Sequence, residues 1–338
     1  MVRGKLTIIS CDSGKYFADK IALEITKFRA EQEIRHVNMK EETFANGEIK
    51  VVIEKSVRGD DVFIVQCVEN PHHPKSINDR IMAMFCAIDA ARRAGAAFVN
   101  LIVPTYPYAR QEKKKSREPI TASLIANVLE SLSLNSIITL DVHADAITGF
   151  FQVTDFINLF AANTIMRYLN ANYSGAINNL VVVSPDTGGA PRARFYARKL
   201  GAELAMMNKE RDYSTVNVVE KVTLIGSVKG KNVLLVDDII DTGGTIVGVI
   251  DELKKHGANE VLVATTFPLM NGKCIDKFKE LFDRGSLKAV VGTDAVYHNE
   301  KFFELYPWYK EVSLAPLFAK VINTINLRKP ISDVIGKR

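Results

Sequence analysis

The stretch Val-Leu-Leu-Val-Asp-Asp-Ile-Ile-Asp-Thr-Gly-Gly-Thr, residues 233–245, indicates the fold of this chain. Its first four residues form a continuous apolar run, which is typical of a strand buried on both faces of a parallel sheet. The run ends at Asp237 and Asp238, the acidic pair, where we expect the chain to leave the core. Apolar residues then follow at the spacing of one helix face, namely Ile246, Val249, Ile250 and Leu253. The order is strand, acidic pair, glycine-rich loop and helix, which in an open α/β sheet places polar groups at the carboxyl end of a strand.

The two halves of this stretch suit different parts of one ligand. Gly243 and Gly244 allow the backbone to approach a phosphate, and the hydroxyls of Thr242 and Thr245 add hydrogen bonds to it. The acidic pair repels phosphate but suits vicinal sugar hydroxyls or Mg²⁺. A phosphorylated sugar satisfies both halves, whereas the stretch lacks the lysine of a P-loop and the glycine spacing of a dinucleotide fold. The alternative is an ordinary strand, turn and helix with an acidic cap.

Length and composition indicate a globular protein with two domains. The chain has 338 residues, which is longer than one typical domain. Its net charge of +5 is modest, so small anionic substrates account for it and we expect no nucleic-acid partner. The four cysteines lie far apart and predict neither a zinc site nor a disulfide framework. No apolar run has membrane-spanning length and no signal peptide precedes the first strand, so we expect a cytoplasmic protein that does not bind a membrane.

Strand and helix patterns alternate along the chain, which predicts an α/β fold with helices on both faces of parallel sheets. The apolar runs expected as strands are 6–10, 49–53, 62–65, 100–103, 137–140, 180–183, 233–236, 261–266 and 289–291. The main expected helices are 16–30, 77–93, 246–257 and 316–327. We place the domain junction between residues 151 and 158, where one set of strands ends and the next begins.

Polar side chains also follow other predicted strands. Asp186 stands in a second strand-to-glycine-loop transition, Ser-Pro-Asp-Thr-Gly-Gly. His143 follows a strand and has an aspartate on each side, which favours contact with a metal or phosphate over a structural role. Residues 104–121 form a proline-bounded basic loop, which either attracts anions or is a solvated face. A further short strand ends in a basic loop that contains Lys209 and Arg211.

With these motifs together, the chain resembles the ribose-phosphate pyrophosphokinases, or phosphoribosyl-pyrophosphate synthetases, of the phosphoribosyltransferase superfamily. Five motifs occur in the order expected for that family, at residues 44–48, 107–121, 141–151, 183–194 and 236–245. The resemblance implies two phosphoribosyltransferase-like domains, each a mainly parallel sheet flanked by helices. Residues 1–156 would carry the ATP-side loops and 157–338 the ribose 5-phosphate site, with the last helix packing back on the first domain.

The resemblance also implies a reaction and its residues. The β,γ-diphosphoryl group of Mg-ATP would pass to the 1-hydroxyl of ribose 5-phosphate, giving AMP and the phosphoribosyl pyrophosphate used in nucleotide biosynthesis. Ribose 5-phosphate would be bound by Asp237, Asp238, Asp241, Thr242, Gly243, Gly244 and Thr245. ATP would be bound by Phe44, Asn46, Glu48, Arg110, Gln111 and His143, the first three reaching the adenine of ATP held mainly by a neighbouring subunit. The metal Mg²⁺ would be held by His143 and Asp186, and the catalytic residues would be Lys209, Arg211 and His143.

Family members form dimers that build hexamers, so the resemblance implies a homo-oligomer. Two other functions stay open. A phosphoribosyltransferase would share residues 233–245 but would not need the Arg110 loop or a second similar domain. A non-catalytic regulatory relative could lose Lys209, Arg211 or the acidic pair, and all of them are present. One departure from the family is the segment 69–75, Glu-Asn-Pro-His-His-Pro-Lys.

Overall fold

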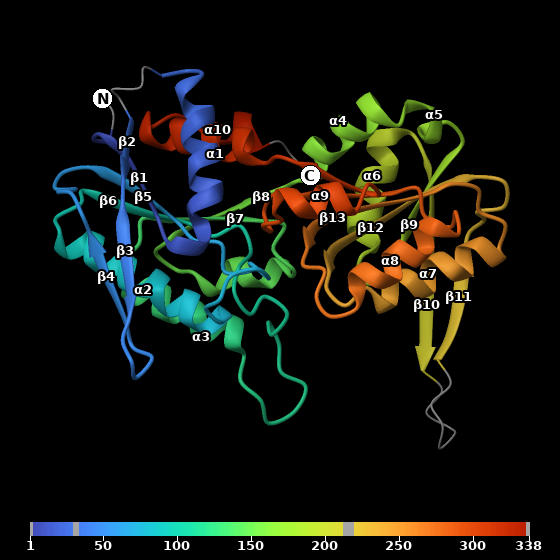
Figure 1. Ribbon diagram of the computed structural model, residues 1–338, viewed down its shortest axis with the longest axis horizontal. Helices are drawn as coiled ribbons and strands as arrows, with labels where there is room; N and C mark the ends of the chain where they lie inside the picture. The colour runs from blue at the N-terminus through green and yellow to red at the C-terminus, as the bar shows by residue number, and fades with distance from the viewer. Residues whose placement is uncertain (1–2, 30–33, 212–219, 336–338) are drawn as a thin grey trace. The chain divides into compact units, whose positions relative to one another are not determined.

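The computed structural model describes residues 3–29, 34–211 and 220–335. The chain divides into two compact units (Figure 1). Unit 1 comprises the described residues of Met1–Phe160 and Ser313–Lys337, and unit 2 is Ala161–Val312. In the part of the chain that the structure describes, every helix is too short or too polar to cross a lipid bilayer.

Unit 1 contains a six-stranded sheet in the order β2-β1-β5-β6-β7-β8, in which every neighbouring pair is parallel. These strands are β1 Leu6–Ser10, β2 Ile34–Val37, β5 Asp61–Val65, β6 Phe98–Ile102, β7 Ser136–Leu140 and β8 Asp155–Leu159. A separate antiparallel hairpin pairs β3 Met39–Thr43 with β4 Ile49–Ile53. The helices are α1 Lys15–Thr26, α2 Ile77–Arg93, α3 Thr121–Ser131, α10 Ala315–Asn326 and α11 Ser332–Ile335, with 3-10 turns at Asp12–Gly14 and Asp145–Phe150.

The sheet of unit 1 is buried between two layers of helices. Helices α1 and α10 lie side by side on one face, and α2 and α3 cover the other (Figure 1). Phe17 of α1 and Phe318 of α10 meet edge to face with their ring centroids 5.1 Å apart. Asn326, at the end of α10, donates a hydrogen bond of 2.9 Å to the buried carboxylate of Asp61. Helix α10 is therefore part of the core of unit 1.

Unit 2 contains a seven-stranded sheet in the order β11-β10-β9-β12-β13-β14-β15, in which only the β10–β11 pair is antiparallel. Its strands are β9 Leu180–Ser184, β10 Glu203–Arg211, β11 Glu220–Ile225, β12 Asn232–Ile240, β13 Val261–Pro268, β14 Ala289–Thr293 and β15 Tyr309–Val312. Its helices are α4 Ala162–Asn172, α5 Ser174–Ile177, α6 Ala190–Leu200, α7 Gly244–Lys255, α8 Cys274–Asp283 and α9 Glu300–Leu305.

The sheet of unit 2 is also covered on both faces, by α4 and α6 on one side and by α7 and α8 on the other (Figure 1). The helix face predicted after the glycine loop is confirmed, because its four apolar residues are the buried residues of α7. They are Ile246, Val249, Ile250 and Leu253. The predicted fold class is confirmed, since each unit is a mainly parallel sheet flanked by helices.

Three local predictions were wrong. The chain does not leave the core at the acidic pair, because β12 continues to Ile240 and keeps pairing with β13, which runs to Pro268. Lys209 and Arg211 do not lie in a loop, because β10 extends through Arg211 against β11. The helix expected over residues 16–30 ends at Thr26. In the first two cases a neighbouring strand supplies the hydrogen-bond partners, and local sequence does not reveal that strand.

Candidate active site

Two polar loops meet at the carboxyl edge of the sheet in unit 2. Strands β9 and β12 are parallel neighbours, so the loops that follow them leave the same edge side by side. One loop carries Asp186, and the other carries residues 241–245, while the acidic pair lies near the carboxyl end of β12 itself. Carboxyl ends of adjacent parallel strands are where open α/β sheets bind their ligands.

The acidic pair is held by an arginine from the neighbouring loop's helix. Arg192, in the first turn of α6, places Nη2 3.2 Å from Asp238 Oδ2 and Nη1 3.9 Å from Asp237 Oδ1. The backbone amide of Asp238 also donates to Asp237 Oδ1 over 2.9 Å. One guanidinium therefore faces two adjacent carboxylates and offsets part of their mutual repulsion.

Burial raises the pKa of Asp237 well above its ordinary value, and the charge of Asp238 adds to the effect. Arg192 acts in the opposite direction and lowers it. The ionised form of Asp237 is therefore less favourable in the free protein, and hydrogen-bond donors from a ligand would stabilise it. Vicinal hydroxyls of a sugar are matching donors.

The glycine-rich loop turns through a left-handed glycine into the start of a helix. Gly243 has φ 72°, in the left-handed region, and is the N-cap of α7. A Cβ on Gly243 would lie 2.7 Å from Cys274 Sγ and 2.9 Å from Phe278, so only glycine fits. The next two residues, Gly244 and Thr245, are exposed at the amino end of the helix, where free backbone amides can face a phosphate.

The remaining residues of this loop are held by the segment after β13. Asn271 donates a hydrogen bond of 2.9 Å to Asp241 Oδ1, and its backbone amide donates to the Asp241 carbonyl. Lys277 of α8 donates to the carbonyl of Thr242 over 3.2 Å. Cys274, beneath the loop, is fully buried, and burial raises the pKa of its thiol to about 12. A neutral thiol at this place packs as an apolar group.

The Asp186 loop is ordered by its own hydrogen bonds. The backbone amide of Gly189 donates to Asp186 Oδ1 over 2.8 Å, and the Ser184 hydroxyl donates to the Asp186 carbonyl over 2.7 Å. Asp186 is exposed at the edge of the sheet. Its carboxylate is therefore available to a ligand while its backbone is fixed.

In unit 1, two further loops share a carboxyl edge, because β6 and β7 are parallel neighbours. The loop after β7 carries His143, which is exposed. The loop after β6 carries Arg110 and Gln111, both exposed. Gln111 is oriented by the hydroxyl of Thr121, which donates to its side-chain oxygen over 2.6 Å. These three predicted ATP residues thus lie on adjacent loops of one unit.

The hairpin of β3 and β4 carries the other predicted ATP residues at its tip. Phe44 and Glu48 close the turn with a backbone hydrogen bond of 2.8 Å, and Asn46 Oδ1 accepts from the amide of Glu48. The Phe44 side chain is 49% exposed, which leaves an aromatic face open to a ligand. Between the hairpin tip and α2 lies a cavity of about 630 Å³ that Phe44, Asn46, Glu48 and Met82 line.

For Lys209 and Arg211 the structure describes the position of the backbone only. They pair with Val222 and Glu220 across the antiparallel β10–β11 ladder, and their side chains lie outside the described part of the structure. The segment 212–219 that joins the two strands is likewise outside it. Both residues thus lie in the last residues of β10, which is between β9 and β11 in the sheet.

Comparison with known proteins identifies the family. Residues 6–132 match the N-terminal domain of ribose phosphate pyrophosphokinase, and residues 157–299 match the phosphoribosyl transferase domain. A Streptococcus pneumoniae protein named ribose-phosphate pyrophosphokinase 1 is 36% identical over 331 residues, which is 97% of this chain and 96% of that protein. The ribose-phosphate pyrophosphokinase of Listeria ivanovii is 35% identical over 332 residues, 98% of this chain and 97% of that protein. The chain belongs to the ribose-phosphate pyrophosphokinase family.

A solved structure agrees with this assignment. The phosphoribosylpyrophosphate synthetase from Mycobacterium smegmatis superposes with a TM-score of 0.84 at 32% identity, over 96% of this chain and 99% of that one. The predicted resemblance to ribose-phosphate pyrophosphokinases is confirmed. The match to the N-terminal domain of that family also separates the chain from a phosphoribosyltransferase that has only the second domain.

Sequence reasoning missed two basic residues that contact the acidic pair and the glycine-rich loop. Arg192 follows the second glycine loop, but nothing local indicated that it faces the acidic pair 45 residues further along. Lys277 lies 35 residues after Thr242 and carried no motif at all. A cation next to several carboxylates is an expected feature of such a site, but only the packing of helices against strands selects which cation it is.

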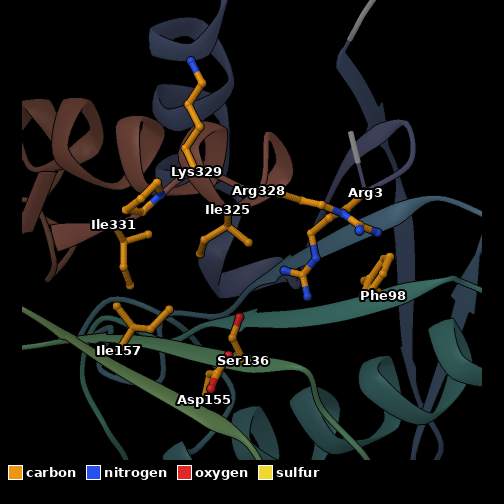
Figure 2. A pocket seen from close by; sticks show the side chains of 10 residues that line it. Arg3, Phe98, Ser136, Asp155, Ile157, Ile325, Arg328, Lys329 and Ile331 are labelled. Atoms are coloured by element: carbon orange, nitrogen blue, oxygen red, sulfur yellow. The ribbon is translucent and has the colours of Figure 1, made fainter. Parts of the chain in front are cut away.

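Another cavity, of about 560 Å³, lies at the amino ends of β6, β7 and β8, where Phe98, Ser136 and Asp155 line it (Figure 2). Arg3 stacks on the ring of Phe98, with the guanidinium carbon 4.2 Å from the centroid. Since parallel strands have their amino ends at one edge, this cavity is on the opposite edge of the sheet from His143. It is separate from the predicted ATP loops.

Proposed function

We propose that this chain transfers the β,γ-diphosphoryl group of ATP to the 1-hydroxyl of ribose 5-phosphate, which yields phosphoribosyl pyrophosphate and AMP for nucleotide biosynthesis. The observation that carries the proposal is the similarity over nearly the full chain to proteins named ribose-phosphate pyrophosphokinase. The geometry of unit 2 supports it, because carboxylates for a ribose adjoin an anion-binding loop for its phosphate.

The ribose 5-phosphate half of the site would lie in unit 2. The acidic pair accepts hydrogen bonds from the sugar hydroxyls, and Arg192 holds both carboxylates in place. Residues 241–245 and the amino end of α7 bind the 5-phosphate, where Gly243 allows the turn. The sugar is thereby oriented with its 1-hydroxyl ready to attack, which is the main protein contribution in phosphoryl transfer.

The nucleotide half would be formed by Arg110, Gln111 and His143, while Phe44, Asn46 and Glu48 would reach the adenine of ATP held mainly by a neighbouring subunit. Aromatic stacking by Phe44 suits a purine base, since half of its surface is open. Arg110 is a natural partner of phosphate oxygens. Lys209 and Arg211 would stabilise charge that develops on the transferred group and on the leaving AMP.

Asp186 fits a role in holding Mg²⁺, because its exposed carboxylate is the oxygen ligand that this ion prefers. Within residues 3–29, 34–211 and 220–335, no group of three or more His, Cys, Asp or Glu side chains is arranged to hold a metal ion. This agrees with a magnesium ion held by one or two protein ligands and by substrate phosphates. The family resemblance also implies His143 as a metal ligand. When bound with ATP, Mg²⁺ offsets the charge of the triphosphate.

The proposed assignment of ATP loops to residues 1–156 and of the ribose 5-phosphate site to residues 157–338 follows the family. A homo-oligomer built from dimers, and a place in the cytoplasm where ATP is available, belong to the same proposal. The test is AMP release from ATP in the presence and absence of ribose 5-phosphate, with solution mass measured alongside. AMP that forms only with both substrates supports the proposal, and AMP formation independent of ribose 5-phosphate contradicts it.

A further inference from the structure

Lys277 is placed beside the proposed phosphate loop by the packing of α8. Its neighbours on that helix, Cys274 and Phe278, are fully buried and lie directly under Gly243. Residues three apart share one helix face, so Lys277 emerges on the side of Cys274 that meets the loop. The same close packing that requires glycine at 243 thus brings the lysine to the loop.

The ammonium group of Lys277 bonds to the loop backbone at Thr242 and lies beside Gly244. Its Nζ donates a hydrogen bond of 3.2 Å to the Thr242 carbonyl. The same Nζ lies 3.8 Å from the position that a Cβ on Gly244 would occupy. An ammonium group has three donors, so two remain for another acceptor in front of the helix end.

The charges around the loop require a cation at this place. Asp237, Asp238 and Asp241 all lie within the same stretch as the phosphate loop and disfavour a dianion. The nearby guanidinium of Arg192 is committed to the acidic pair. Lys277 is a positive group in direct contact with the loop itself, which allows it to compensate the charge of a bound phosphate.

We propose that Lys277 binds the 5-phosphate of the sugar substrate together with the backbone amides of residues 242–245. The proposal rests on the proposed function and adds a charged side chain to a site that otherwise relies on backbone and hydroxyl groups. Because the contact is made only to the phosphate, Lys277 determines the preference for a phosphorylated sugar over a free one. It makes no contribution to nucleotide recognition.

The test compares Lys277→Gln, Lys277→Arg and a control, Lys279→Gln, on the same helix. Lys279 is exposed and pairs with Asp283 one turn away, so its loss leaves the loop untouched. The KM values for ribose 5-phosphate and for ATP are measured for each variant. Calorimetry then gives the binding of ribose 5-phosphate and of unphosphorylated ribose without turnover.

We expect Lys277→Gln to raise the KM for ribose 5-phosphate at least ~10-fold, because a hydrogen bond to a charged group is lost, with the KM for ATP within about twofold. The preference for ribose 5-phosphate over ribose falls by a similar factor, while Lys277→Arg restores most of it and Lys279→Gln matches the wild type. An unchanged KM for ribose 5-phosphate, or equal weakening of both sugars, overturns the proposal. If the wild type releases no AMP, the proposed function fails, and calorimetry still decides the role of Lys277.

Discussion

Arg192 Nη2 lies 3.2 Å from Asp238 Oδ2, which joins the first turn of α6 to the carboxyl end of β12. The same guanidinium lies 3.9 Å from Asp237 Oδ1. The contact connects the loop that carries Asp186 with the carboxylates proposed to hold the ribose. One arginine therefore links two parts of the proposed site within unit 2.

Replacement of this arginine provides the first prediction. Arg192→Gln removes the positive group that faces both carboxylates, so we expect the KM for ribose 5-phosphate to rise about 10-fold or more. The KM for ATP should change much less. Arg194→Gln is the control, because Arg194 is exposed on the same helix and carries the same charge. Steady-state kinetics with each substrate varied in turn make the measurement, and equal effects of the two substitutions contradict the assigned role.

Asp237 should lower the stability of the free protein at neutral pH. Burial raises its pKa in the folded state well above the unfolded value of about 3.9, so its ionised form is less favourable in the folded protein. Stability is therefore lost as pH rises from the unfolded pKa toward the folded one. Asp237→Asn should raise the Tm at pH 7 and have a diminishing effect as pH falls toward 4. Activity should fall sharply in the same variant.

Thermal unfolding of the wild type and Asp237→Asn across that pH range checks this prediction. Asp251→Asn serves as the control, since Asp251 is exposed on α7 and pairs with Arg284 at the surface. A Tm of Asp237→Asn below that of the wild type at pH 7 would show that the carboxylate stabilises the fold instead.

Gly243 should tolerate no side chain. In Gly243→Ala, the alanine would have to adopt the left-handed backbone at φ 72°. Its Cβ would also lie 2.7 Å from Cys274 and 2.9 Å from Phe278. We expect a loss of roughly 2–4 kcal/mol in the free energy of unfolding, from backbone strain and overpacking together. Gly248→Ala, further along α7, meets no atom within 4 Å and should stabilise by about 0.5–1 kcal/mol. Denaturant unfolding of both variants separates the two outcomes, and equal values would count against the packing argument.

Lys75, in the segment that departs from the family, should hold the base of the β3–β4 hairpin. Its Nζ lies 2.6 Å from Glu41 Oε2 and 3.1 Å from Asp12 Oδ2, and the Glu41 carboxylate is 1% exposed. Burial lowers the pKa of Lys75, but hydrogen bonds and charges from Glu41 and Asp12 outweigh it and give a net rise. Lys75→Met should therefore cost about 3 kcal/mol of stability, because it removes the cation beside a buried carboxylate that keeps only the hydrogen bond from the Asp12 backbone amide.

Urea unfolding measures that loss, and Lys40→Met is its control. Lys40 pairs with Glu42 on the exposed side of the same hairpin, where an ion pair contributes little. The double variant Glu41→Gln with Lys75→Met should recover part of the lost stability, since the buried charge is then absent. A double variant no more stable than Lys75→Met alone would refute this account.

Lys209 should act in the chemical step. We expect Lys209→Ala to lower kcat by roughly 100-fold or more, with little change in the affinity for ribose 5-phosphate, because a charge that stabilises the transition state is removed. Lys288→Ala is the control, as Lys288 is an exposed residue of unit 2 paired with Glu260. Near-normal kcat in Lys209→Ala would remove the residue from catalysis.

Much of the fold was predictable because parallel strands and amphipathic helices have strong local patterns. The helix predicted over residues 77–93 is α2 without change, since a capping box at Ser76 and Asp79 begins it and Gly95, at φ 82°, follows it. The strand over residues 6–10 is β1 for the same kind of reason. The local pattern was weaker for the end of β10 and for β11. These segments contain many polar residues, and they form strands because they pair with each other.

The sequence by itself determined that a buried strand, a glycine loop and a helix follow one another in residues 233–255, because each of these depends on residues close together in the chain. It also indicated the family through the order of its motifs. Only the tertiary structure decided that β12 continues through the acidic pair, that Arg192 faces that pair, and that Lys277 meets the loop. Arg192 and Lys277 each contact residues that lie 35 or more positions away in the chain. Strand order and helix packing bring these residues together, and no local sequence pattern encodes either of them.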